Sequence, residues 1–76
     1  MNNQEFLTEY ILRDLTLYLM EDENLDMPSA MAFIYNSEVY IKLMDQETGL
    51  YIESSAYVYE LLKEEYRMGK LATNGG

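Results

Sequence analysis

The segment from Glu5 to Glu23 constrains the fold of this 76-residue chain more than any other feature. It contains neither Gly nor Pro, and its apolar residues recur at three- and four-residue steps, which predicts a helix. On a helical wheel at about 100° per residue, the apolar side chains cover roughly 240°. A helix that packs on a single core shows an apolar stripe of the order of 100° or somewhat more. We therefore expect two apolar contacts, one with its own domain and one with a second chain.

This helix has a second interpretation, and its polar residues carry further expectations. The same breadth would arise if the helix were central and enclosed by the other three helices. Asp14 interrupts the apolar face, and we interpret it as an edge carboxylate paired with Lys42 or Arg67 rather than as a buried acid. Asn2 or Asn3 is the expected N-cap, because a short side-chain oxygen can accept a hydrogen bond from the first turn.

The chain has no Cys and no His. Disulfides and thiolate metal ligands are therefore excluded, and the commonest general base and transition-metal ligand are missing. Without a neighbouring base, Ser37, Ser54 and Ser55 are interpreted as helix caps and not as nucleophiles. The glycines form no phosphate-binding loop. We expect no catalytic residue, no metal and no cofactor, and the chain is predicted not to be an enzyme.

One stretch resembles a calcium loop in its spacing only. Asp22, Asn24 and Asp26 stand at the first, third and fifth positions of such a loop. Met27 then occupies the position that needs Gly, and Phe33 the position that needs a bidentate Glu. We interpret the stretch as the end of the first helix and a turn.

The net charge of −9 restricts the classes of partner. Binding to nucleic acid or to an anionic membrane needs clustered Lys and Arg, whereas the basic residues here are scattered singly. The beginning of the chain shows no signal-peptide pattern, and no uncharged stretch is long enough to cross a bilayer. We expect a cytoplasmic chain that binds neither nucleic acid nor membrane.

A second, short helix is predicted from Met27 to Tyr35. Asp26 would cap it, and Pro28 suits a first turn because its missing N–H is not needed there. Methionines at helical spacing are more often core residues than the wall of an adaptable binding groove. We therefore assign four residues of one face to the core: Met27, Met31, Ile34 and Tyr35.

The region 38–53 has two interpretations. We favour a helix over Val39–Met44, capped by Ser37, with Gly49 in a left-handed conformation and Leu50–Ile52 as an extended connector on the core. The alternative is a β-hairpin across 38–53, because β-branched and aromatic residues alternate there.

The last helix is predicted from Ala56 to about Met68, capped by Ser54 or Ser55 and ended by Gly69. The expected fold is therefore mainly α, a small bundle of three or four helices, with an α+β fold carrying a hairpin at 38–53 as the alternative. Residues 1–70 would form a single helical domain and 71–76 a disordered tail.

Several short motifs occur in the second half of the chain: YNS, then a KL pair, ETGLY and S-x-x-Y-V-Y. Over at most residues 34–66 this pattern resembles a family of small uncharacterised bacterial proteins, common in gut Firmicutes. Such proteins tend to be encoded beside predicted toxin genes, including ADP-ribosyltransferase-like ones. The resemblance implies an antitoxin or an accessory interaction module. The residues that carry it are Tyr35 to Ser37, Lys42 and Leu43, Glu47 to Tyr51, and Ser54 to Tyr59.

The eight tyrosines are the main compositional excess. Tyr combines a large apolar area with a hydroxyl group and so suits protein interfaces, although half-buried tyrosines are also common on small domains. The predicted function is a non-catalytic protein–protein interaction module that is also a homodimer. The alternatives are an acidic transcription-regulatory protein or DNA mimic, and a purely structural role in its own dimer. The predicted partner-binding residues are Tyr10, Leu12, Leu19, Tyr59 and Tyr66.

Overall fold

The structure, a computed structural model, describes the backbone of residues 3–75 and the side chains of residues 3–69. The described chain contains four α-helices, two short 3-10 helices and no strand. The predicted mainly α fold is therefore confirmed, and the hairpin alternative for 38–53 is wrong. In chain order the elements are α1 (Asn3–Glu23), α2 (Met27–Tyr35), α3 (Glu38–Met44), η1 (Gln46–Thr48), η2 (Leu50–Ile52) and α4 (Ser55–Gly75).

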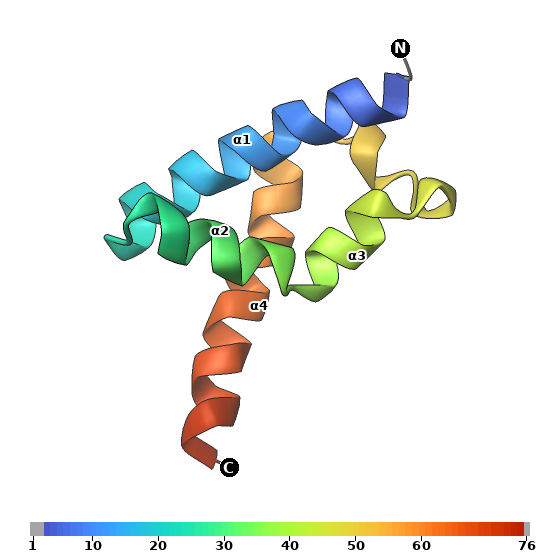
Figure 1. Cartoon of the computed structure of the whole chain (residues 1–76). Helices are drawn as coiled ribbons and strands as arrows, with labels where there is room; N and C mark the ends of the chain where they lie inside the picture. The colour runs from blue at the N-terminus through green and yellow to red at the C-terminus, as the bar shows by residue number, and fades with distance from the viewer. Residues whose placement is uncertain (1–2, 76) are drawn as a thin grey trace.

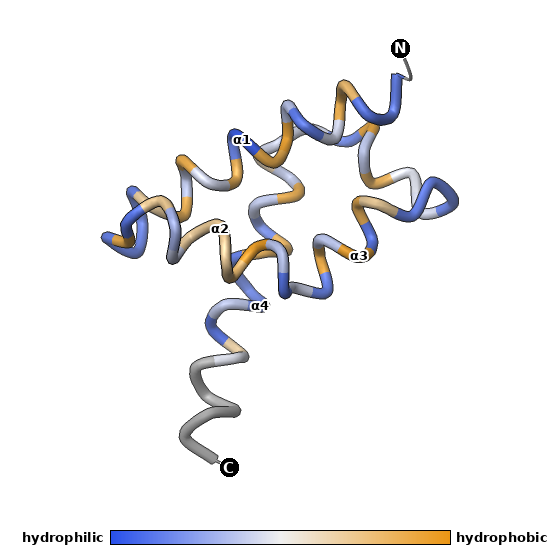
Figure 2. Tube along the Cα trace, viewed as in Figure 1, coloured by the Kyte–Doolittle hydropathy of each residue, from blue (hydrophilic) through white to orange (hydrophobic). Residues whose placement is uncertain are grey.

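Helices α1 and α2 form an antiparallel pair, and α4 crosses both of them at a steep angle (Figure 1). Helix α3 continues the chain beyond α2, and the two 3-10 helices bring it back towards the beginning of α1. The end of α4 projects from the body, so the molecule measures 41 × 24 × 18 Å. Apolar positions are interspersed with hydrophilic ones along the whole of α1 (Figure 2).

The core lies where the helices meet. Helix α1 contributes Ile11, Leu15 and Leu19, which stand four residues apart and form one buried stripe. Full burial of an aliphatic side chain contributes about 1.5 to 3 kcal/mol, so this stripe is a main source of stability. The other buried apolar residues come from every remaining helix except η1: Ala30, Ile34, Val39, Leu43, Leu50, Val58, Tyr59 and Leu62.

Helix α1 ends at a motif that the sequence analysis did not identify. Asn24 adopts a left-handed conformation with φ of 56°, and the Leu25 N–H donates to the Met20 carbonyl at 3.1 Å. This six-residue closure is a Schellman motif, in which a residue with positive φ satisfies the last carbonyls of a helix. Met20 and Leu25 also both pack against the core. The asparagine that stands in the calcium-like spacing thus ends the helix.

Helix α2 has the predicted bounds and the predicted cap. The Asp26 carboxylate accepts a hydrogen bond from the Ser29 N–H at 2.9 Å, and Pro28 lies in the first turn. Hydrogen bonds from Ser29 hold the pKa of Asp26 below its ordinary value.

The predicted core face of α2 is only partly right. Ile34 is buried as expected, but its buried companion is Ala30, and Met27, Met31 and Tyr35 are exposed. Helix α2 is therefore rotated so that the small Ala30 is fully buried and the two methionines are exposed. Apolar spacing alone did not distinguish these two rotations.

Helix α3 is held at its first turn by two side chains. The predicted cap Ser37 accepts from the Tyr40 N–H at 3.0 Å, and it donates to the Ile34 carbonyl at 2.6 Å. The Glu65 carboxylate of α4 accepts from the Glu38 N–H at 2.7 Å and from the Val39 N–H at 3.1 Å. Three of the free N–H groups that begin every helix are satisfied in this way.

The connection to α4 combines a correct prediction with a wrong one. Gly49 has φ of 68°, as expected. Leu50–Ile52, however, is a 3-10 helix and not an extended connector, because the Ile52 N–H donates to the Gly49 carbonyl at 3.1 Å. This tight turn directs Leu50 into the core and leaves Ile52 exposed.

Ser54 caps α4 by accepting from the Tyr57 N–H at 3.1 Å. The helix continues to Gly75, so the prediction that Gly69 ends it is wrong. A glycine ends a helix by adopting a left-handed conformation, and Gly69 has no positive φ. The predicted disordered tail at 71–76 falls on residues whose side chains lie outside the description, and residue 76 lies outside it entirely. The predicted cap Asn2 also lies outside the described residues, and Asn3 is already part of α1.

The predicted ion pair of Asp14 with Lys42 or Arg67 does not form. Among the described side chains the ion pair present joins Lys63 and Glu60, three residues apart on α4. Asp14 is half-buried near the middle of α1, whereas both proposed partners are exposed. Charge pairing therefore contributes little to this fold.

Candidate interaction surface

An open apolar groove lies between α1 and α2. It encloses about 330 Å³, and because two methionines form one of its walls, we call it the methionine groove. Met27, Met31 and Tyr35 are 50, 36 and 47% exposed there. The groove is bordered by Glu9, Leu12, Arg13, Thr16, Leu17, Met27, Met31 and Tyr35.

A second, more polar hollow lies between the beginning of α1, the end of α2 and α3. It encloses about 480 Å³, and we call it the threonine hollow after Thr8. Tyr35 and Tyr40 meet edge to face at its border, with ring centroids 5.0 Å apart. Its border consists of Gln4, Glu5, Thr8, Glu9, Leu12, Tyr35, Tyr40 and Met44.

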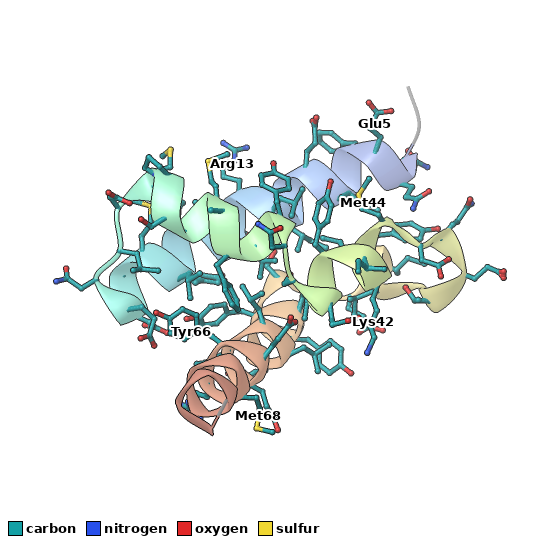
Figure 3. All side chains as sticks on the ribbon, turned by 60° about the horizontal axis from the view of Figure 1, so that its bottom comes forward. Glu5, Arg13, Lys42, Met44, Tyr66 and Met68 are labelled. Carbon is teal, nitrogen blue, oxygen red and sulfur yellow. The ribbon has the colours of Figure 1, made fainter. Side chains whose placement is uncertain are left out.

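The groove and the hollow adjoin along α1. In Figure 3, Glu5 and Met44 from the hollow and Arg13 from the groove extend from the same side of the molecule. The two depressions therefore form one surface, which runs along most of α1 and has an apolar part and a part with two carboxylates. The residues that border both depressions are Glu9, Leu12 and Tyr35.

Thr8 carries a buried polar atom without a partner. The residue is 5% exposed, and its hydroxyl oxygen makes no hydrogen bond. A threonine inside a helix usually donates to the carbonyl four residues earlier. Thr16 does so on the same helix, with its hydroxyl 2.8 Å from the Leu12 carbonyl. An unpaired buried hydroxyl costs about 1 to 3 kcal/mol, so Thr8 is an unfavourable residue for stability alone.

An outer apolar stripe lies on the side of α1 that faces away from the core. Phe6, Tyr10 and Leu17 are 57, 54 and 51% exposed. Because they stand four and seven residues apart, they share one side of the helix. Helix α1 is therefore not enclosed by the other helices, and the alternative of a central helix is wrong. One of the two expected apolar contacts, with its own domain, is present.

Tyr59 joins α4 to the end of α1. Its hydroxyl donates to the Asp22 carboxylate at 2.7 Å, and its ring lies 5.2 Å from that of Tyr18. Burial, and then the hydrogen bond and negative charge of Asp22, raise the pKa of Tyr59 above its ordinary value. A tyrosine that is harder to ionise is a structural donor and not a candidate acid or base at neutral pH.

The five predicted partner-binding residues do not form one site. Leu19 and Tyr59 lie in the core, and Tyr66 is half-buried against Phe33, with ring centroids 4.9 Å apart. Tyr10 is exposed on the outer stripe, and Leu12 borders both depressions. The methionine groove itself was weighed in the sequence and not chosen, although the spacing of Met27 and Met31 carried the signal.

Within the described residues no cluster of three or more acidic side chains is arranged to hold a metal ion. In the same part of the chain, none of the helices combines the length and the apolar character that crossing a bilayer requires. The fold and the surface define a small all-α domain with an open groove. Comparisons with protein-family models, curated proteins and solved structures found no match. The resemblance to the bacterial family stays an expectation.

Proposed function

We propose that this chain is a non-catalytic protein–protein interaction module that holds an amphipathic helix of a partner protein in the methionine groove. The observation that supports the proposal is the exposure of Met27, Met31 and Tyr35 beside Leu17, all along one groove. Methionine adapts its shape to a partner because its side chain is unbranched and polarizable. A helix laid in an apolar groove is a recurrent mode of peptide recognition.

The charge of the chain narrows the partner. With a net charge of −9, the chain attracts a basic protein and repels another copy of itself at long range. We therefore propose a basic partner whose helix has an apolar face. The resemblance described above implies that this partner is the product of a neighbouring gene, to which the chain would be an antitoxin or an accessory.

The test first captures a partner protein with the wild-type chain. It then compares the affinity of that partner for the wild-type chain, a groove variant and a control variant. The double variant Met27→Gln and Met31→Gln adds polarity to the groove without adding charge, and Met68→Gln makes the same change at an exposed position on α4. We expect the wild-type chain and the control to bind the partner equally and the double variant to bind at least about tenfold more weakly. Equal binding by all three chains, or capture of background proteins only, would refute the proposal.

A second candidate is the homodimer, which the outer stripe of Phe6, Tyr10 and Leu17 favours. Exposed apolar residues that share one side of a helix form a self-complementary surface when two copies pack about a twofold axis. Light scattering on the purified chain measures the mass in solution. One chain has a mass of 8.9 kDa, and a homodimer would have twice that mass. The double variant Phe6→Gln and Tyr10→Gln is expected to be monomeric. A monomeric wild-type chain would remove this candidate without affecting the groove.

The DNA-mimic alternative rests on the charge alone. Its binding to a basic protein would weaken steeply as salt is raised, because it depends on screened charges. Binding in the methionine groove would keep the part of its affinity that comes from apolar burial, so a salt series distinguishes a complete loss of binding from a partial one.

A further inference from the structure

The threonine hollow has the composition of a site for a cation. Glu5 and Glu9 border it one helical turn apart, and neither forms an ion pair with a described residue. Like charges at this spacing repel each other within a helix. Arg13, one turn further along α1, borders the methionine groove and forms no ion pair with Glu9. A positive group placed in the hollow would relieve the repulsion.

The buried hydroxyl of Thr8 is a second and independent indication of a ligand. Thr8 lines the hollow, and its hydroxyl oxygen, which is buried as the side chain stands, has no hydrogen-bond partner. Threonine in a helix divides between two side-chain rotamers, so the hydroxyl can turn to a group in the hollow without a backbone change. A hydroxyl oxygen accepts hydrogen bonds from N–H donors, which agrees with the sign of charge that the two carboxylates favour.

The aromatic border distinguishes between kinds of cation. Tyr35 and Tyr40 lie edge to face, so their ring planes differ by 75°. A planar guanidinium can stack on such a ring while its five N–H groups reach carboxylate and hydroxyl oxygens on other sides. An ammonium group has three donors on one compact point and remains more strongly hydrated. The arrangement fits a guanidinium group better.

We propose that the threonine hollow binds the guanidinium group of an arginine side chain on the partner helix whose apolar face lies in the methionine groove. That the arginine belongs to a partner helix rests on the proposed function. That the hollow binds a guanidinium group does not depend on it. Because Glu9, Leu12 and Tyr35 border both depressions, one helix along α1 reaches both. The proposal predicts a partner helix with an arginine beside its apolar face.

The experiment uses two probes on the full chain. The first is a pair of 16-residue amphipathic helical peptides with a leucine-rich face. One peptide carries its single arginine near the N-terminus and the other near the C-terminus, and each is compared with the same peptide in which neutral citrulline replaces the arginine. The second is N-acetylarginine amide, a small guanidinium compound. Calorimetry measures affinity, and NMR identifies which backbone amides shift. For the peptide that binds more tightly, we expect replacement of arginine by citrulline to lower the affinity at least about tenfold. We also expect the arginine peptide to shift the NMR signals of the Thr8 and Tyr40 amides.

Each outcome has one meaning. A peptide that binds equally well with arginine or citrulline overturns the arginine subsite and leaves the groove proposal standing. Binding of the small amide at Thr8 without peptide binding supports the guanidinium site but refutes its place beside a partner helix, and with it the helix-in-groove function. No binding by any probe overturns both.

Two variants separate recognition from folding. Thr8→Val replaces the hydroxyl by a methyl group of similar size, and we expect it to fold at least as stably while losing most of the preference for arginine. The double variant Glu5→Gln and Glu9→Gln keeps the shape and removes the charge, and the preference should disappear there as well. Variants that keep a tenfold preference would overturn the assignment of these groups.

Discussion

The Glu65 carboxylate is expected to contribute to stability out of proportion to its position on the surface of α4. It accepts two backbone N–H groups of α3, at 2.7 and 3.1 Å, and it is half-buried. We expect Glu65→Ala to destabilise the fold, because the two N–H groups lose their acceptor and the beginning of α3 loses a favourable negative charge.

The magnitude follows from two comparable terms. Loss of a capping side chain costs about 0.5 to 2 kcal/mol, and loss of the charge near the beginning of a helix about 0.3 to 1 kcal/mol. We expect about 2 kcal/mol in total for Glu65→Ala and about half of that for Glu65→Gln, which keeps an acceptor oxygen. A domain of this size has roughly 4 to 11 kcal/mol of stability, so the change is large. It corresponds to a fall in melting temperature of about 10 °C.

Urea unfolding followed by circular dichroism measures this loss. The matched control is Glu64→Ala, because Glu64 is the neighbouring residue, is exposed and makes no hydrogen bond with a described residue. The control should lie within about 0.5 kcal/mol of wild type, as most surface substitutions do. Adding Ser37→Ala to each chain should show coupling with Glu65 only, since both residues cap the same helix. If Glu65→Ala and Glu64→Ala have equal midpoints, the reasoning is refuted.

Three further predictions concern single residues. Gly49→Ala should cost about 1 kcal/mol because φ there is positive, whereas Gly69→Ala within α4 should stabilise by about 0.5 to 1 kcal/mol; both are measured by thermal melts. Tyr59 should ionise at a pH above the ordinary pKa of tyrosine in a titration at 295 nm. Because its folded pKa is raised, its contribution to stability is complete below an unfolded pKa of about 10 and is lost as the pH rises above that value, an effect absent in Tyr59→Phe. Leu19→Ala should cost about 2 to 5 kcal/mol in urea, and Leu17→Ala much less, because only the first leaves a cavity in the core.

Local chemistry explains which parts of the fold could be predicted. Asp26, Ser37 and Gly49 were assigned correctly because a cap or a positive φ involves a residue and its near neighbours in sequence. Asn24 belongs to the same class, because an asparagine directly after a helix can adopt the positive φ that ends it, but it was not assigned as the end of α1. Side-chain caps and residues with positive φ are thus both indicated by the sequence.

Contacts between helices could not be predicted from the sequence. Nothing in the pattern links Glu65 to α3, since the rotation and crossing of α4 decide what its carboxylate meets. The rotation of α2 has a similar origin, because the packing of the helices buries Ala30 and leaves Met31 exposed. Of the five predicted partner-binding residues, Leu12 borders the groove and the hollow, because the rotation and crossing of the helices decide which apolar residues reach that surface.

The link between α4 and the beginning of α3 also bears on how a growing chain acquires its structure. An isolated helix shorter than about 12 to 15 residues is marginal in water, and α3 has 7 residues. The N–H groups of Glu38 and Val39 donate to the Glu65 carboxylate, which lies 27 and 26 positions later in the chain. On the ribosome, α3 is synthesised before Glu65, so the hydrogen bonds at its beginning are completed only after Glu65 has left the exit tunnel. A chain cut short before that residue would lack the acceptor of the first two N–H groups of α3.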